Sequence, residues 1–116
     1  MRSVGSHLIF ELWGCDDSIN STEIVEQTLR ELTEVAKARL LGLHLHPFSP
    51  QGVTGVAIIS ESHILIHTWP ELGYAAVDLF TCGEPVDPDA VIPVLKQRFN
   101  PTHVQVLQLF RGIAGD

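Results

Sequence analysis

The sequence carries little positive charge. Lysine and arginine together supply only 7 of 116 residues, against 14 aspartates and glutamates, so the formal net charge is −7. Because phosphate backbones select basic surfaces, this balance argues against a nucleic-acid-binding protein. An acidic surface raises the local concentration of cations, so the same balance favours a cationic ligand.

Long apolar runs are also missing. No segment reaches the roughly 18 consecutive apolar residues of a membrane helix, and the N-terminus has no apolar stretch of the kind that ends in a signal-peptide cleavage site. We therefore expect a cytoplasmic protein that does not bind membranes. The only two cysteines are Cys15 and Cys82, and in that compartment we expect both as reduced thiols, although one disulfide between them is a possible alternative.

The composition indicates one folded domain. Apolar residues make up 45% of the chain and charged residues 18%, which is typical of a globular protein and not of a disordered one. A chain of this length buries a sizeable core but has little room for a second module. We predict a single domain over residues 1–116.

Hydrophobic periodicity predicts the secondary structure. A period of two predicts strands over residues 7–13, 40–46, 53–59, 63–68, 74–82 and 103–110. The strand over residues 53–59 has the composition of a strand that is buried on both faces. An apolar stripe predicts a helix over residues 21–38 with Asn20 as its N-cap. A second helix is predicted to start at residues 87–88, where Pro93 favours a kink or a late start.

This order of elements predicts an α+β fold. We expect a two-layer sandwich in which a mostly antiparallel sheet carries two helices on one face. The other face holds polar groups such as Glu11 and Asp78 together with Trp13, Leu65 and Phe80, and is too apolar to be left in water. We therefore predict a homodimer in which the two sheets face each other across a buried site.

The residue types alone leave several chemistries open. A metal site would need His67, Asp78 and Cys82 to converge from neighbouring strands, and the alternative is a set of hydrogen-bonded histidines in the sheet. Cys82 and His67 also suit a thiolate nucleophile with its base, or two ordinary core residues. Ser62 lies in what reads as a hairpin connection, without a G-x-S-x-G motif or a phosphate-binding glycine loop.

A much longer pattern surrounds that serine. Residues 52–71 read GVTGVAIISESHILIHTWPE, residues 73–83 read GYAAVDLFTCG, and residues 46–52 read HPFSPQG. Together with the opening segment from residue 5, they resemble the small bacterial and archaeal S-adenosylmethionine decarboxylases, which are pyruvoyl-dependent enzymes. The resemblance is dense from residue 5 to about residue 87.

The resemblance implies that the chain cleaves itself. Ser62 would attack the carbonyl of Glu61, an N→O acyl shift would give an ester, and β-elimination would split the chain. The products would be a fragment of residues 1–61 and a fragment of residues 62–116 whose N-terminus is a pyruvoyl group made from Ser62.

Two further residues match the processing machinery of that family. His67 matches the residue that accepts the α-proton of the serine during elimination. Thr54 stands where the family usually has a serine implicated in processing. Because threonine keeps the hydroxyl but is stiffer at χ1, we expect slow or tuned cleavage.

The resemblance also implies how substrate is bound and converted. The pyruvoyl ketone would form a Schiff base with the amine of S-adenosylmethionine and act as an electron sink as CO₂ leaves. Cys82 matches the proton donor to the product carbon. Phe48 matches a residue that stacks on adenine and Glu71 one that binds ribose, while Glu11 would oppose the sulfonium charge. The product is the aminopropyl donor for spermidine and polyamine biosynthesis.

Two alternatives remain at this level. The same chemistry would serve a pyruvoyl-dependent ornithine or arginine decarboxylase, although Phe48 and Glu71 favour an adenosyl substrate. The chain would otherwise be an uncleaved, non-catalytic paralogue that binds a ligand or an active partner.

Overall fold

The computed structural model describes residues 3–60 and 62–113. Its elements in chain order are β1 (Gly5–Trp13), η1 (Asp17–Asn20), α1 (Thr22–Val35), β2 (Leu40–Pro47), β3 (Val53–Ile59), β4 (Ser62–Trp69), η2 (Pro70–Leu72), β5 (Tyr74–Cys82), α2 (Pro88–Phe99) and β6 (His103–Arg111). The strands form one six-stranded sheet in the order β2-β3-β4-β5-β1-β6, and each neighbouring pair is antiparallel. The predicted α+β class is confirmed.

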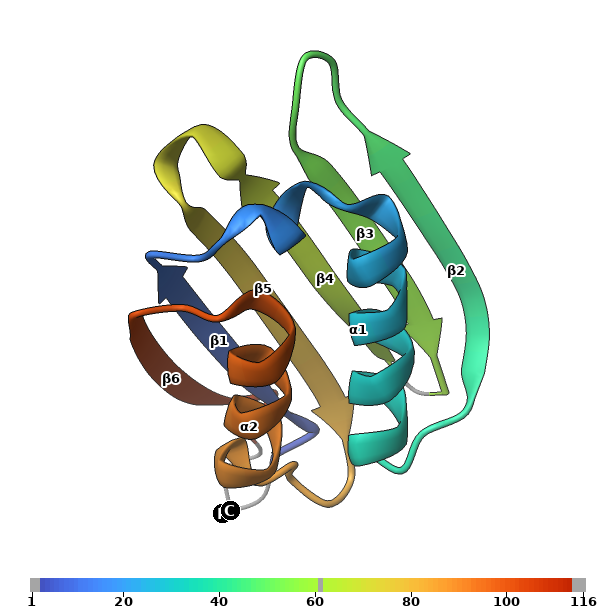
Figure 1. The fold of residues 1–116 in the computed structure, drawn as a ribbon. Helices are drawn as coiled ribbons and strands as arrows, with labels where there is room; N and C mark the ends of the chain where they lie inside the picture. Colours follow the sequence, from blue (N-terminus) through green and yellow to red (C-terminus); the bar gives the residue numbers. More distant parts are fainter. Residues whose placement is uncertain (1–2, 61, 114–116) are drawn as a thin grey trace.

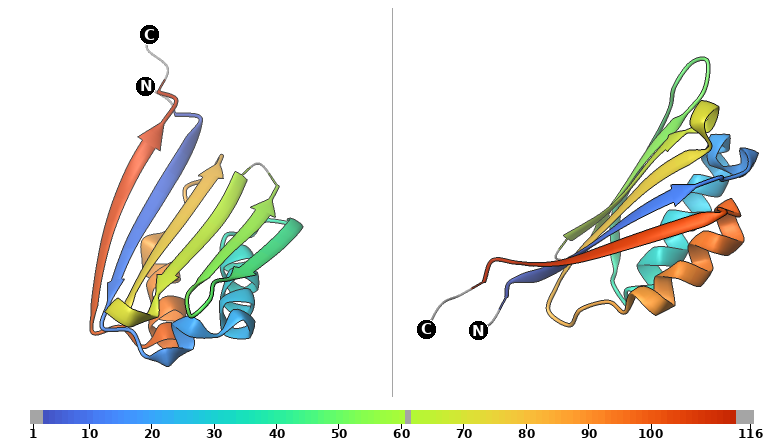
Figure 2. Two further views of the ribbon diagram at one scale, coloured as in Figure 1. Left: turned by 90° about the horizontal axis from the view of Figure 1, so that it is seen from above. Right: turned by 90° about the vertical axis from the view of Figure 1, so that its left-hand side faces the viewer.

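Both helices cover the same face of the sheet (Figure 1; Figure 2, right). Alternate residues of each central strand point into this layer, as in β5, where Ala75, Val77 and Leu79 are fully or almost fully buried. The termini of the described chain lie together at one end of the sheet, where β1 begins and β6 ends (Figure 2). Neither helix in the described part is long and apolar enough to span a membrane.

The start of α1 differs from the prediction in a way that matters for the site. Ser21, and not Asn20, is the N-cap, and its hydroxyl oxygen accepts the backbone N–H of Ile24 at 3.1 Å. The Asn20 side chain instead accepts the backbone N–H of Gly52 at 2.9 Å. Asn20 therefore anchors the β2–β3 loop to the helical layer.

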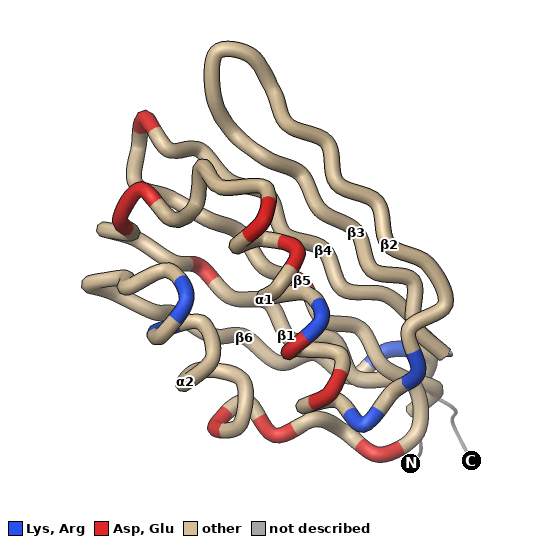
Figure 3. Tube along the Cα trace, turned by 45° about the vertical axis from the view of Figure 1, so that its right-hand side comes forward, with Lys and Arg blue, Asp and Glu red and all other residues tan. Residues whose placement is uncertain are grey.

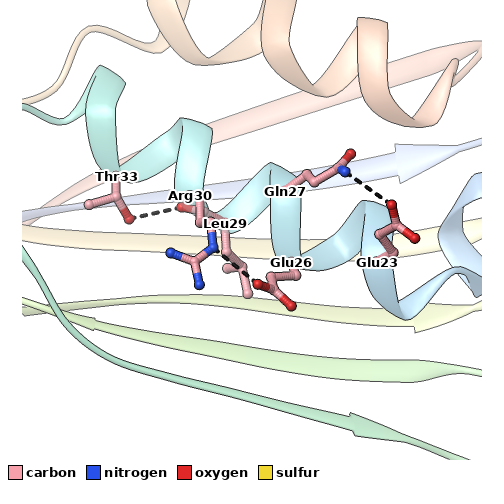
Figure 4. A network of polar contacts seen from close by, with 6 residues as sticks. All are labelled: Glu23, Glu26, Gln27, Leu29, Arg30 and Thr33. Carbon is pink, nitrogen blue, oxygen red and sulfur yellow. Dashed lines mark hydrogen bonds and ion pairs between the residues drawn. The ribbon is translucent and has the colours of Figure 1, made fainter.

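The outer face of α1 is polar (Figure 4). Arg30 Nε donates to Glu26 at 3.1 Å, and Gln27 donates to Glu23 at 3.4 Å, one helical turn away in each case. The buried stripe of the same helix includes Leu29 and faces the sheet. Because the polar and the buried residues lie on opposite faces of α1, the hydrophobic periodicity predicted this helix to within a few residues.

Pro93 does not delay the second helix, so the predicted late start is wrong. The helix α2 begins at Pro88, where the Asp87 side chain accepts the backbone N–H of Asp89 at 2.9 Å. Proline at the first helical position is preorganised for a helix. The ring of Pro93 lies on the exposed side of α2, away from the core.

The second face of the sheet is uncovered, and we refer to it as the open face. The prediction that β3 is buried on both faces is wrong for the single chain, because Ile58 is 54% exposed. Other large apolar side chains with at least 39% exposure on this face are Trp13, Trp69, Leu107 and Leu109. The apolar composition of β3 suits a strand that is buried on both faces, yet nothing within the described chain covers its open face.

Candidate active site

Ser62 begins β4 at the end of a tight hairpin with β3. Ser60 holds this hairpin to the preceding chain, because its N–H donates to the Arg39 carbonyl at 2.8 Å and its hydroxyl oxygen accepts the Arg39 N–H at 3.1 Å. The Ser62 hydroxyl oxygen is buried and has no hydrogen-bond partner among the described residues. An unsatisfied buried hydroxyl costs free energy, so it marks a position with a role other than folding. Glu61 lies outside the described residues.

Cys82 lies near Ser62. The register of β4 against β5 pairs His63 with Phe80, and its continuation sets Ser62 opposite Thr81, one position from Cys82. Cys82 is the last residue of β5 and alternates onto the open face with Phe80. The two predicted catalytic positions thus share one end of the sheet.

His67 and Thr54 lie at the other end. They are register partners in β4 and β3, and Thr54 Oγ1 is 3.0 Å from His67 Nδ1. His67 follows Ser62 by five positions, which at the rise of an extended strand is roughly 17 Å. The odd spacing also puts the two side chains on opposite faces of β4. One chain therefore does not bring His67 to Ser62.

The thiolate–imidazole pair of Cys82 and His67 does not form within one chain either. His67 pairs with Ala76, which precedes Cys82 by six positions, or roughly 20 Å. No group of three or more His, Cys, Asp or Glu side chains in the described residues is arranged to hold a metal ion. Cys15 carries a free thiol, so the alternative disulfide to Cys82 is absent.

A cavity of about 450 Å³ surrounds His67. Its lining residues come from β3, β4, η2 and the β2–β3 loop: Phe48, Gln51, Gly52, Thr54, His67, Thr68, Trp69 and Glu71. The structure thus brings together four of the predicted site residues. It adds Trp69, which lies one residue beyond the strand predicted over residues 63–68. The signal that locates Trp69 is its spacing of two from His67, which puts both side chains on the open face.

The β2–β3 loop presents Phe48 to this cavity. The Phe48 N–H donates to the Gly52 carbonyl at 2.8 Å, and Gly52 is tied to Asn20. Gly52 has a φ of +102°, and a Cβ there would lie 3.2 Å from the Thr68 carbonyl oxygen, so glycine suits the close approach. The Phe48 ring meets His46 edge-on at 4.6 Å and is 51% exposed, which leaves it available to stack on a ligand.

Glu11 lies beside the cavity in an aromatic setting. Its carboxylate accepts the hydroxyl of Tyr74, the only tyrosine. The ring of Tyr74 lies 4.4 Å from that of Trp13 and 5.3 Å from that of Trp69. Burial, followed by the hydrogen bond and charge of Glu11, raises the pKa of Tyr74 to about 12. Glu11 is therefore held in place next to an aromatic row that ends at the cavity.

These features define an enzyme-like α+β sandwich. At one end is a buried serine hydroxyl that has no hydrogen-bond partner among the described residues, and at the other is an aromatic, carboxylate-bearing cavity. The family model described as S-adenosylmethionine decarboxylase matches residues 6–112. The chain belongs to the S-adenosylmethionine decarboxylase family.

Individual proteins of this family match the chain over its full length. The chain is 52% identical to the S-adenosylmethionine decarboxylase proenzyme of Thermomicrobium roseum, with 100% of both chains covered. It is 48% identical to the proenzyme of that name from Methanococcus maripaludis, covering 100% of this chain and 96% of that protein. The crystal structure of the adenosylmethionine decarboxylase from Aquifex aeolicus superposes with a TM-score of 0.89 at 33% identity, covering 100% and 97%.

Proposed function

We propose that this protein converts S-adenosylmethionine to decarboxylated S-adenosylmethionine, the aminopropyl donor of polyamine biosynthesis, after cleaving itself between Glu61 and Ser62. Family membership over residues 6–112 is the observation that carries the activity. The buried hydroxyl of Ser62, without a partner among the described residues, supports the cleavage site.

The surroundings of Ser62 fit its conversion to a pyruvoyl group. The conversion removes a buried hydroxyl, and no hydrogen bond between described residues is lost with it. When present, the pyruvoyl group supplies a ketone that captures the substrate amine and accepts the electrons released with CO₂.

Cleavage begins with Ser62. A hydroxyl that is not hydrogen-bonded to another acceptor can rotate toward the carbonyl carbon of residue 61. Serine is a weak nucleophile, and holding its oxygen close to that carbon raises the rate of attack. His67 is the proposed acceptor of the Ser62 α-proton. If Nδ1–H of His67 donates to Thr54 Oγ1 across their 3.0 Å contact, then Nε2 is the unprotonated nitrogen that takes the proton.

The separation of Ser62 from His67 leads us to propose a homodimer with shared sites. In our proposal two copies pair through their open faces in opposite orientations, so that Ser62 and Cys82 of one copy meet the cavity of the other. A two-fold axis creates this meeting at both ends at once.

Two properties of the open face support a second copy as its cover. The face carries exposed large apolar side chains, which water disfavours. Its charges are also complementary end to end: Arg111 lies near the Ser62 end, whereas Glu11 and Glu71 lie near the cavity. An antiparallel pairing of two faces brings opposite charges together.

The cavity residues suit an adenosyl substrate. In our proposal the ring of Phe48 stacks on adenine, Trp69 supplies a second aromatic surface, and the Glu71 carboxylate accepts hydrogen bonds from ribose hydroxyls. Glu11 opposes the sulfonium, and Cys82 donates the proton to the product carbon. A short diamino acid such as ornithine or arginine needs neither aromatic ring.

One experiment tests cleavage and activity together. Denaturing mass spectrometry of the purified protein should show fragments of residues 1–61 and 62–116, with a carbonyl reagent attached to the second. Ser62→Ala should give a single folded, uncleaved and inactive chain. CO₂ release from S-adenosylmethionine, and not from ornithine or arginine, should accompany cleavage. An intact wild-type chain after long incubation would instead support a non-catalytic binding protein.

A further inference from the structure

The functional proposal leaves unused a group of basic side chains around Phe80. The rings of His7 and His63 lie 5.7 Å and 5.8 Å from the Phe80 ring, and the guanidinium carbon of Arg111 lies 4.9 Å from its centroid. Phe80 is two positions before Cys82 and faces the same side of β5. The group is therefore on the open face, at the end where Ser62 lies.

Arg111 stands out among the lysines and arginines of the described chain. The others, Arg30, Lys37, Arg39, Lys96 and Arg98, lie on the two helices or between α1 and β2, and only Arg111 lies in a strand. The blue segments in Figure 3 show that lysines and arginines are sparse along the trace. The open face of the described sheet thus has one permanently charged cation. In a chain with a net charge of −7, this cation makes the Ser62 end of the face a suitable place for an anionic group.

The strand pairing places Arg111 and Cys82 in the same row of the sheet. Arg111 pairs with Gly5, and Gly5 pairs with Cys82, so the three form one row across β6, β1 and β5. A Cβ on Gly5 would lie 2.8 Å from the Phe80 ring. The absence of a side chain at Gly5 therefore lets the Phe80 ring approach the row that joins Arg111 to Cys82.

His7 adds a second donor. Its Nε2 atom is buried without a hydrogen-bond partner in the described residues, and the nearest carboxylate oxygen, that of Asp78, is 4.0 Å away. Burial lowers the pKa of His7, partly offset by the charge of Asp78, so the ring is predominantly neutral near pH 7. The buried nitrogen has capacity for a hydrogen bond that a ligand can supply.

We infer that Arg111, assisted by His7, binds the α-carboxylate of the substrate, an assignment that rests on the proposed function. The substrate amine must reach the group made from Ser62, and the carboxylate sits on the same carbon as that amine. A planar guanidinium matches a carboxylate with two parallel hydrogen bonds. The acidic and aromatic residues at the cavity end suit the adenosyl and sulfonium parts, which leaves the carboxylate for a cation.

The loss of Arg111 should mainly affect substrate affinity. The carboxylate loses its charge as CO₂ forms, so a contact that is strong only in the ground state would slow the reaction. A guanidinium that holds the carboxylate about equally in the ground state and in the transition state instead contributes to substrate affinity and selects amino acids over amines. We therefore expect its loss to raise KM and to leave kcat nearly unchanged.

The test compares Arg111→Met with Arg30→Met, a matched arginine variant on the outer face of α1. For Arg111→Met we expect KM for S-adenosylmethionine to rise about tenfold with kcat within about threefold, and Arg111→Lys to recover part of the loss. The inhibition constant of decarboxylated S-adenosylmethionine, which lacks the carboxylate, should change less than about twofold. Arg30→Met should change none of these values.

Results that contradict the Arg111 assignment can be told apart from a failure of the proposed function. An unchanged KM, or equal weakening of both compounds, would overturn the assignment. Equal weakening together with a lower dimer fraction at assay concentration would identify Arg111 as a partner of carboxylates on the second copy. Failure of the proposed function shows separately, as an uncleaved or inactive wild-type protein. In that case, calorimetry can compare how tightly wild-type protein and Arg111→Met bind S-adenosylmethionine and decarboxylated S-adenosylmethionine, and the assignment requires that the substitution weakens mainly the first compound.

Discussion

Tyr74 links a carboxylate to two aromatic rings on the open face. Its hydroxyl donates to Glu11, while its ring lies between Trp13 and Trp69. Ionisation of the phenol would set two negative charges side by side in a partly buried setting. This cost explains why the folded state holds the phenolic proton tightly.

Because the chain has a single tyrosine, its titration is directly measurable from phenolate absorbance. We expect a midpoint near 12, because burial and then Glu11 raise the pKa of Tyr74 to that value. Glu11→Gln should lower the midpoint but leave it above the ordinary tyrosine pKa of about 10, because burial still raises the pKa of Tyr74. Since the folded-state pKa is the raised one, the contribution to stability is present below about pH 10 and is lost as pH rises through about 12. Equal midpoints for the wild-type and Glu11→Gln proteins would show that the Tyr74–Glu11 contact is absent, and a wild-type midpoint near 10 would show that Tyr74 is not buried either.

Thr54 provides a second test at the scale of single residues. Thr54→Val keeps the branched shape but removes the hydrogen bond to His67, so we expect self-cleavage to slow by about 100-fold. Thr54→Ser keeps the hydroxyl on a less restricted side chain and should cleave at least as fast as wild type. The measurement is the cleavage half-time by denaturing gel after synthesis of the intact chain. Equal half-times for the valine and wild-type proteins would remove the hydroxyl from the processing step.

At the scale of elements, the closeness of α1 to β3 depends on Gly55. A Cβ at this position would lie 2.8 Å from Leu29 and 3.0 Å from Leu45, each at the Cδ1 atom. Gly42 is a matched control in the neighbouring strand, because its Cβ would come no closer than 3.7 Å to Ile58. The two glycines thus differ in the space around them.

We expect Gly55→Ala to lower the free energy of unfolding by about 1–3 kcal/mol, since the buried leucines must shift. Gly42→Ala should be neutral or stabilising by up to about 1 kcal/mol, because alanine restricts the unfolded chain. Urea unfolding of both variants in the Ser62→Ala background avoids mixtures of cleaved and intact chains. Equal effects of the two substitutions would mean that α1 packs less closely on β3 than described.

The fold was largely predictable from the sequence because the strands alternate clearly. The predicted spans of all six strands and of α1 agree with the structure to within a few residues. Local irregularities were not predictable: a register shift between Leu40 and Gly42 turns Leu41 outward, to 57% exposure. Such shifts depend on which strand is the neighbour, and periodicity along one strand carries no information on that.

The site was predictable residue by residue but not as an arrangement. Resemblance supplied Phe48, Thr54, His67 and Glu71, and the structure brings these four together. The distance from His67 to Ser62 follows from their spacing once β4 is recognised as a continuous strand. Which end of a partner would meet each group depends on a contact between two chains, and no pattern within one chain specifies it.

At the scale of the whole molecule, the shared-site dimer makes a prediction that a self-contained chain does not. In a heterodimer of Cys82→Ala and Phe48→Ala, one site combines an intact Cys82 with an intact Phe48, and the other site has both substitutions. Each homodimer has two defective sites. We expect co-expressed, doubly tagged heterodimers to regain about half the wild-type CO₂ release per dimer at low substrate concentration.

The matched control pairs a wild-type chain with a chain that carries both substitutions. Its heterodimer contains the same residues in total, but in a shared-site dimer each site has one defect, so we expect low activity. If each site were formed within one chain, the results would be reversed: the wild-type chain would retain half the activity and the heterodimer of single variants would have little. Because the two heterodimers differ only in how the substitutions are distributed, the comparison separates the arrangement of the site from the importance of either residue.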